Sequence, residues 1–154
     1  MLNWQWRTFT ELTSHELYDL LALRQEVFVI EQTCIYPDLD YYDQKALHLL
    51  GWKDKKLVAY ARLFEKDIRY PNSVSIGRIV TSPSIRGEGI GKEIMNHLLK
   101  YLEKTNSTHP VTISARFYLE KFYNSFGFQP VGELYDEDGT PHIKMIKDYA
   151  KINS

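Results

Sequence analysis

The sequence Arg86-Gly87-Glu88-Gly89-Ile90-Gly91-Lys92 joins a strand-like run, residues 74–81, to a helix-like run, residues 90–103. Glycines let a backbone turn tightly and come close to a ligand. The first turn of a helix directs free N–H groups and the positive end of its dipole to the same place. With two cationic side chains beside them, these features predict a binding site for a phosphorylated cofactor.

Two common phosphate-binding loops do not fit this spacing. A P-loop requires Gly-x-x-x-x-Gly-Lys followed by Ser or Thr, but Arg86 stands at its first glycine and no hydroxyl residue follows Lys92. The dinucleotide fingerprint Gly-x-Gly-x-x-Gly fails because its last glycine would fall on Lys92 or Ile94. The pattern that remains is Arg-x-x-Gly-x-Gly, with its glycines at Gly89 and Gly91.

This pattern resembles the pyrophosphate-binding motif of the GNAT superfamily of N-acetyltransferases. Residues 115–128, Ala-Arg-Phe-Tyr-Leu-Glu-Lys-Phe-Tyr-Asn-Ser-Phe-Gly-Phe, are similar to a later helix and strand of that superfamily. Residues 23–34, 76–80 and 135–143 resemble its ElaA-type branch. The resemblance runs roughly from Trp4 to Ile146, and a glycine-rich turn without a ligand is the alternative interpretation of the loop.

The resemblance implies an α/β (α+β) GNAT fold, in which helices flank both faces of one mixed, mostly antiparallel central sheet of about seven strands. It implies a single N-acetyltransferase domain over residues 1–154 and acetyl-CoA as the donor. The acetyl group would move directly to an acceptor amine in a ternary complex. The amine, on a small molecule or a peptide, stays open. The alternatives are a non-catalytic acyl-CoA-binding sensor and an interaction module with an empty cleft.

The resemblance also assigns the cofactor site. Backbone N–H groups of residues 87–92 would bind the diphosphate, and the planar fork of Arg86 suits paired hydrogen bonds to phosphate. The end of the preceding strand would run along the pantetheine arm. The expected cofactor-binding residues are Ile79, Val80, Thr81, Arg86, Gly87, Glu88, Gly89, Ile90, Gly91, Lys92 and Phe122.

Tyr123 matches, by resemblance, the tyrosine that protonates the leaving thiolate in many GNAT enzymes. A phenol with a pKa near 10 is a sensible acid for a thiolate whose thiol has a pKa near 8.5. The alternative is a core aromatic residue. Tyr118, Phe122 and Phe126 are spaced as one apolar helix stripe, which predicts that Tyr123 points about 100° away from it.

No single residue stands out as the base for the acceptor amine. Arg24 and Arg78 lie in otherwise apolar elements, and a buried arginine is costly unless it is paired. We therefore expect each to meet a carboxylate, with Glu31 as a plausible partner. His142 and His48 are candidate neutral-pH bases. The candidate substrate-binding residues are Arg24, Glu31, Arg78 and His142, with His48 as a further pocket candidate.

Acidic residues cluster in two loops that the resemblance places around the acceptor. An acidic rim would attract a cationic amine, whereas the alternative is a set of solvated loop charges. These residues are Glu31, Asp38, Asp40, Asp43, Asp136, Glu137 and Asp138.

The composition excludes several other classes. A net charge of −1 gives no basic surface for nucleic acid, and the sequence has no apolar run long enough for a membrane span. Cys34 is the only cysteine, which excludes an internal disulfide and fits a cytoplasmic location. The five histidines show no metal-ligand spacing, so we expect no metal site. A homodimer is compatible with the family.

Helix and turn signals give the order strand, helix, three strands, helix, strand, helix, two strands. Thr13 and Glu16 have the spacing of a capping box, which predicts a helix start at this point. Helical spacing then continues through residues 24–28. We expect residues 33–45 to form an irregular acidic loop.

Overall fold

The computed structural model describes residues 1–105 and 109–149, and seven strands in this part of the chain form one mixed sheet. Strand β4 is parallel to β5, and the pairs β1/β2, β2/β3, β5/β7 and β6/β7 are antiparallel. This confirms the predicted mixed, mostly antiparallel sheet. In spatial order the strands are β1 (Asn3–Thr8), β2 (Leu47–Lys53), β3 (Lys56–Phe64), β4 (Val74–Thr81), β5 (Val111–Arg116), β7 (Thr140–Lys147) and β6 (Gln129–Glu137).

The chain divides into two compact units. Unit 1 comprises residues 1–63 and 78–97, and unit 2 comprises residues 64–77 and the described part of residues 98–154. None of the helices within residues 1–105 and 109–149 is long and apolar enough to cross a membrane.

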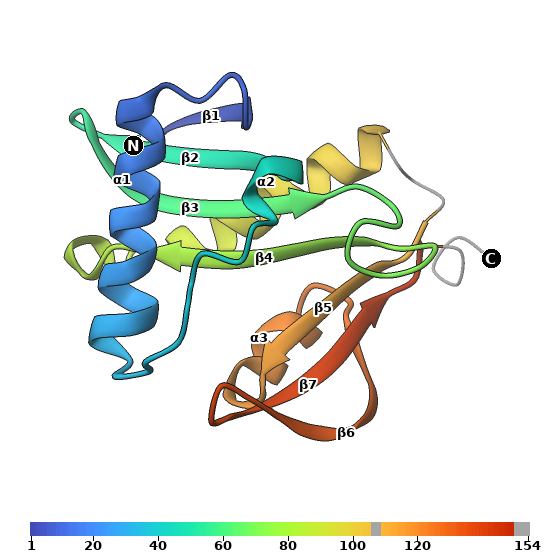
Figure 1. The fold of residues 1–154 in the computed structure, drawn as a ribbon. Coiled ribbons are helices and arrows are strands. Elements are labelled where there is room, and N and C mark those ends of the chain that lie inside the picture. The colour runs from blue at the N-terminus through green and yellow to red at the C-terminus, as the bar shows by residue number, and fades with distance from the viewer. Residues whose placement is uncertain (106–108, 150–154) are drawn as a thin grey trace. The chain divides into compact units, whose positions relative to one another are not determined.

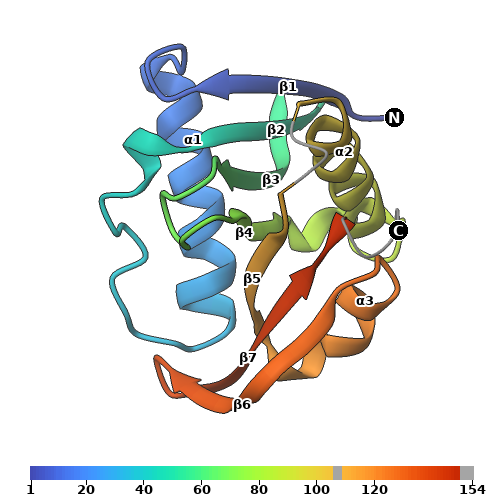
Figure 2. The ribbon, with the colours of Figure 1, turned by 90° about the vertical axis from the view of Figure 1, so that its right-hand side faces the viewer.

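In unit 1, helix α1 (Ser14–Arg24) and the first turns of α2 (Ile90–Thr105) cover opposite faces of β1, β2 and β3 (Figure 2). Side chains alternate between the two faces of a strand. Leu50 is paired with Tyr60 across β2 and β3, and both pack with Leu20 and Leu23 of α1. Figure 1 shows α1 lying across these strands.

Helix α1 starts as predicted. Thr13 Oγ1 accepts a hydrogen bond from the Glu16 N–H at 3.0 Å, and Glu16 Oε1 accepts one from the Thr13 N–H at 2.9 Å. Beyond Arg24 the predicted α-helix is wrong in type, because η1 (Gln25–Glu31) is a π-helix. A π-helix is rare and often accompanies a functional site, and this one ends at a residue of the candidate site.

In unit 2, β5 pairs with β7, and β7 pairs with the edge strand β6 (Figure 1). The start of β4 joins them, with Val74 opposite Val111 and Ser75 opposite Thr112. The register of β6 and β7 shifts between Val131 and Tyr135. Within this stretch Gly132 has a left-handed φ of +83°, and the hydroxyl of Tyr135 after it bonds Ser114 of β5.

The segment after β5 differs from its prediction. It forms a short 3-10 helix, η4 (Phe117–Leu119), and then α3 (Glu120–Asn124). The i, i+4, i+8 stripe does not persist across this junction, because the two helix types have different turns. Tyr118 is 69% exposed, whereas Tyr123 is only 9% exposed. The predicted stripe is therefore wrong for Tyr118, whereas Phe122 and Phe126 contact each other edge to face with ring centres 5.2 Å apart. Tyr123 is the buried residue of this helix.

Candidate active site

The loop between β4 and α2 is anchored to the sheet at its start. The Ser82 N–H donates to the carbonyl oxygen of Val58 in β3 at 2.7 Å. A 3-10 turn, η3 (Pro83–Ile85), follows, and the Ile85 side chain is 3% exposed. The Ser82 hydrogen bond and the buried Ile85 side chain fix the start of the loop, and residues 86–89 lie exposed on the surface.

Two glycines of this loop require their residue type. Gly87 has a φ of +84° and Gly89 a φ of +76°, in the left-handed region that other residues rarely adopt. A Cβ atom at either position would meet no atom within 4 Å, so both glycines border open space. The Gly89 carbonyl accepts the hydrogen bond from the Glu93 N–H at 3.3 Å. The N–H groups of residues 90–92 therefore have no acceptor inside the helix, and the space and its donors fit a phosphate group.

Arg86 stands beside this exposed turn and contacts a carboxylate. Its Nη1 donates to Glu31 Oε2 at 2.9 Å, and its Nη2 lies 2.6 Å from Glu31 Oε1. Glu31 was expected to pair with Arg24 or Arg78, and this expectation is wrong, since its partner is the loop arginine. The paired contact joins the end of η1 to the loop.

The end of β4 combines a buried and a half-buried side. Val80 is 3% exposed and packs in the α1 core, whereas Ile79 and Thr81 are half-buried. Arg78 has a φ of +49°, an unusual conformation for a non-glycine residue inside a strand. Its guanidinium lies 6.0 Å from the centre of the Phe28 ring. Such outliers are common at functional sites.

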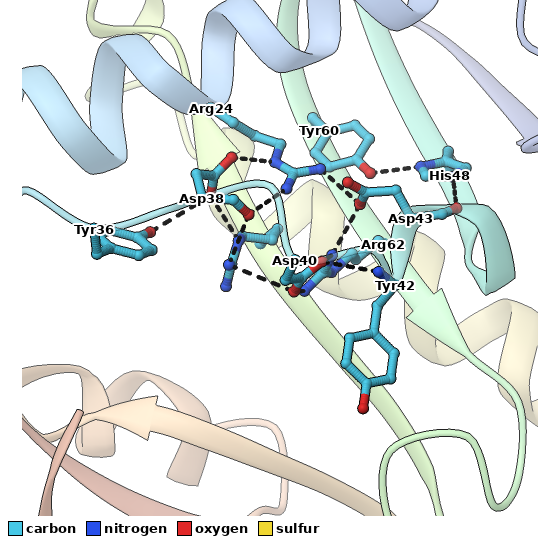
Figure 3. Close-up of polar contacts among 10 residues, drawn as sticks. Arg24, Tyr36, Asp38, Asp40, Tyr42, Asp43, His48, Tyr60 and Arg62 are labelled. Carbon is cyan, nitrogen blue, oxygen red and sulfur yellow. Dashed lines mark hydrogen bonds and ion pairs between the residues drawn. The ribbon is translucent and has the colours of Figure 1, made fainter. Parts of the chain in front are cut away.

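A buried charge cluster fills the space between α1 and the β2–β4 strands (Figure 3). Arg24 has no exposed surface; its Nε donates to Asp38 Oδ2 at 2.8 Å and its Nη1 to Asp43 Oδ1 at 2.7 Å. Arg62 Nη1 donates to the same Asp43 oxygen at 2.8 Å. Arg62 Nη2 also lies 2.6 Å from Asp40 Oδ2. The predicted pairing of Arg24 with a carboxylate is confirmed.

Arg78 completes the cluster. Its Nε donates to Asp38 Oδ1 at 2.8 Å, which confirms its predicted carboxylate partner. Burial alone would raise the pKa of Asp40, but hydrogen bonds and charge from Arg62 outweigh it and hold the pKa of that carboxyl well below its usual range. Three arginines thus face three aspartates, and their formal charges cancel.

In unit 2, Tyr123 lies among aromatic rings. Its ring centre is 6.0 Å from that of Phe128 and 5.3 Å from that of Phe122, both edge to face. Burial raises the pKa of the Tyr123 phenol above its ordinary value, so the group holds its proton at neutral pH. A buried, protonated phenol is suited to donate a proton rather than to accept one.

A second polar group in unit 2 surrounds His142. The His142 Nδ1 lies 2.8 Å from the Thr140 carbonyl oxygen, and its Nε2 lies 3.1 Å from Glu137 Oε2. Glu137 Oε1 accepts a hydrogen bond from Ser114 Oγ at 3.3 Å. Ser114 Oγ also bonds the Tyr135 hydroxyl. Three strands, β5, β6 and β7, therefore bring a carboxylate, an imidazole and two hydroxyls together.

Comparison with known proteins identifies the family. The family model for the acetyltransferase (GNAT) domain matches residues 15–149. The chain belongs to the GNAT superfamily. Protein ElaA of Escherichia coli strain K12 is 43% identical over 150 residues, covering 96% of this chain and 97% of its own. The UPF0039 protein sll0451 of Synechocystis is also 43% identical, over 94% of each chain. This GNAT protein is thus an acyltransferase of the ElaA-type branch.

Solved structures agree with the fold of the GNAT chain. The crystal structure of Escherichia coli ElaA superposes with a TM-score of 0.88 at 43% identity, covering 96% of this chain and 100% of the other. That of an acyl-CoA N-acyltransferase from Pseudomonas aeruginosa gives a TM-score of 0.90 at 41% identity, covering 96% and 99%.

The prediction of an acidic rim is wrong for Asp38 and Asp43 of this GNAT protein. Asp38 is 5% and Asp43 6% exposed, and both are occupied by arginines, so neither presents free charge to a ligand. Arg24 is fully buried and holds the loop of residues 33–45 to α1 rather than contacting an acceptor. Arg62 joins the same cluster and was not singled out, although a lone arginine in an apolar strand carries the same signal as Arg24.

His48 does not line a pocket of the GNAT protein, contrary to its prediction. It has no exposed surface; its Nε2 lies 2.9 Å from the Asp43 carbonyl oxygen and its Nδ1 2.5 Å from the Tyr60 hydroxyl. A carbonyl only accepts, so Nε2 carries the proton and Nδ1 accepts from Tyr60. Burial lowers the pKa of His48, which stays neutral in the core.

This burial predicts a pH dependence of stability. In the unfolded chain His48 takes up a proton near pH 6.5, whereas in the folded GNAT protein it resists protonation. The unfolded state therefore binds more protons below pH 6.5, and the free energy of unfolding should fall by up to about 1.4 kcal/mol per pH unit there. Urea denaturation between pH 7.5 and pH 5.5 measures this slope.

The control for His48 uses another histidine. His48→Gln should lower stability at pH 7.5 but flatten the slope, whereas His15→Gln, at an exposed position, should leave the slope as it is. An equally steep slope in His48→Gln would contradict the assignment.

Within residues 1–105 and 109–149, no group of three or more His, Cys, Asp or Glu could hold a metal ion.

Proposed function

We propose that this protein is an acetyl-CoA-dependent N-acetyltransferase, acting over residues 1–154 as one domain. The proposal assigns it the transfer of an acetyl group to an acceptor amine within a ternary complex. The observation that carries it is the exposed turn at Gly87 and Gly89, which opens onto free space at the start of α2. The 41% identical relative from Pseudomonas aeruginosa, an acyl-CoA N-acyltransferase, supports the donor class.

The loop would hold the diphosphate of the donor. Free N–H groups at the start of α2 supply hydrogen bonds and the positive end of the helix dipole, and Arg86 adds a planar cation. Lys92, exposed in the first turn, adds charge. When bound, acetyl-CoA supplies the activated thioester. Backbone groups of Ile79, Val80 and Thr81 would pair with the pantetheine amides, and Phe122 adds apolar contact.

Tyr123 would be the general acid. Its raised pKa keeps the phenol protonated until a strong base forms beside it, and a thiolate leaving group is such a base. The Tyr123 ring packs edge to face against Phe122 and Phe128, which holds the phenol in an apolar surrounding.

His142 would act on the acceptor together with Glu137. The Glu137 side chain is 48% exposed, so its carboxylate would contact the acceptor, and His142 lies behind it. A carboxylate with an imidazole partner attracts a cationic amine and provides a route for its proton. The acceptor class that fits this arrangement is a primary amine on a small molecule or a peptide. A cytoplasmic location and a homodimer stay predictions.

Calorimetric titration with acetyl-CoA tests the donor assignment. We expect micromolar affinity for acetyl-CoA and weaker binding of dephospho-CoA and ATP. Thiol release with a panel of amines and peptides then tests turnover. The absence of acetyl-CoA binding would overturn the proposal, and binding without turnover by any amine would favour a non-catalytic sensor.

Replacing Tyr123 with phenylalanine should lower kcat about 100-fold, the usual scale for loss of a general acid. Acetyl-CoA affinity should change less than about twofold, because the hydroxyl acts on the leaving group. Tyr118→Phe is the matched control, since Tyr118 is a 69% exposed tyrosine five residues earlier. A Tyr123→Phe enzyme with the kcat of the wild type would exclude this residue as the acid.

A further inference from the structure

The pair of Arg86 and Glu31 uses the whole end face of the guanidinium. Nη1 and Nη2 each meet a different carboxylate oxygen, at 2.9 and 2.6 Å. Two parallel contacts of this kind form the strongest geometry available to an arginine and a carboxylate. The side chains are 43% and 38% exposed, so a ligand reaches the pair from solvent.

The same end face is the one that an arginine offers to a phosphate. A guanidinium has two such forks, an end-on one formed by Nη1 and Nη2 and a side-on one formed by Nε and one Nη. Glu31 occupies the end-on fork of Arg86, so a diphosphate at the adjacent loop that takes this fork displaces Glu31 from Arg86. It would also leave the Glu31 carboxylate, now without its cation, close to a second anion, and like charges at short range repel.

The position of Glu31 explains why it reaches this face. It is the last residue of the π-helix η1, whose wider turns offset its side chain from the position that an α-helix would give it. Three residues earlier, Phe28 of the same π-helix lies 6.0 Å from the Arg78 guanidinium. The π-helix thus places an aromatic ring and a carboxylate beside two arginines of β4 and the following loop.

We propose that Glu31 is an affinity-setting residue of the donor site, a built-in carboxylate that the diphosphate displaces from Arg86. This inference rests on the proposed function. Glu31 lowers the affinity for the donor by holding Arg86 and by repelling the bound diphosphate. It also favours ligands whose diphosphate replaces both contacts over singly charged anions, which would replace them only in part.

Calorimetric titration of the Glu31→Gln variant with acetyl-CoA tests this inference. We expect its dissociation constant to be about two- to fivefold lower than that of the wild type, the range expected from loss of an exposed ion pair. Glu26→Gln is the matched control, because Glu26 is an exposed residue of the same π-helix and its loss changes the net charge equally. Its dissociation constant should stay within about 1.5-fold of the wild type.

The Arg86→Gln variant separates the effect of competition for Arg86 from the effect of the changed net charge. There, adding Glu31→Gln should change the affinity by less than it does beside an intact Arg86. Weaker binding by Glu31→Gln would show that Glu31 positions Arg86 and would overturn the inference, as would equal binding by the wild type and the variant. If neither protein binds acetyl-CoA, the proposed function fails and the inference fails with it.

Discussion

Replacing Gly89 with glutamate is expected to weaken acetyl-CoA binding at least about 100-fold, a change of about 2.7 kcal/mol. The φ of +76° at Gly89 is unfavourable for any residue with a Cβ, by about 1–2 kcal/mol. The new carboxylate would also enter the open space beside the helix N-terminus, where the diphosphate is proposed to lie. Calorimetric titration measures the loss.

Gly132→Glu is the matched control for Gly89→Glu. Gly132 has a φ of +83°, and a Cβ there would likewise meet no atom within 4 Å, but it lies in β6. Both variants should lose similar stability, whereas only Gly89→Glu should lose acetyl-CoA affinity. Unchanged affinity in Gly89→Glu would remove the loop from the donor site.

Replacing Arg24 with methionine is expected to lower the free energy of unfolding by about 3–5 kcal/mol, the usual cost of removing one partner of a buried ion pair. The substitution leaves Asp38 and Asp43 buried with one cation fewer between them. Urea denaturation at pH 7 measures the change. The substitution should also make residues 33–45 more sensitive to proteases, because Arg24 is one of the residues that hold this loop in place.

Arg7→Met is the matched control, since Arg7 forms a partly exposed pair with Glu16 at 3.7 Å and should cost less than about 1 kcal/mol. The double variant Arg24→Met/Asp43→Asn restores the charge balance of the cluster and should recover part of the loss. A cost below 1 kcal/mol for Arg24→Met would contradict the buried cluster as a stabilising element, and full additivity in the double variant would contradict charge balance as its cause.

The features predicted correctly from the sequence depend on local signals. The capping box at Thr13 needs only two residues three apart, and the β4 strand and the start of α2 flank a glycine-rich turn whose backbone demands are local. The need of Arg24 and Arg78 for carboxylates follows from the cost of burying charge. These signals also sufficed for the order of strands and helices.

The features predicted wrongly depend on distant parts of the chain. The π-helix of residues 25–31 has no signal in the local helical spacing, which an α-helix would share. His48 carries no mark in the sequence that distinguishes a buried partner of Tyr60 from a pocket residue. Tyr123 was expected to point away from an apolar stripe, but the break between η4 and α3 turns it inward.

The arginines that hold the loop of residues 33–45 come from three separate elements, α1, β3 and β4. They share three aspartates of the loop: Asp38 contacts Arg24 and Arg78, Asp43 contacts Arg24 and Arg62, and Asp40 contacts Arg62. A chimaera that exchanged this loop for one of equal length from another protein would leave these three arginines without their carboxylate partners. Grafting here therefore succeeds only when the donor loop brings acidic residues in the same register, or when the arginines are redesigned with it.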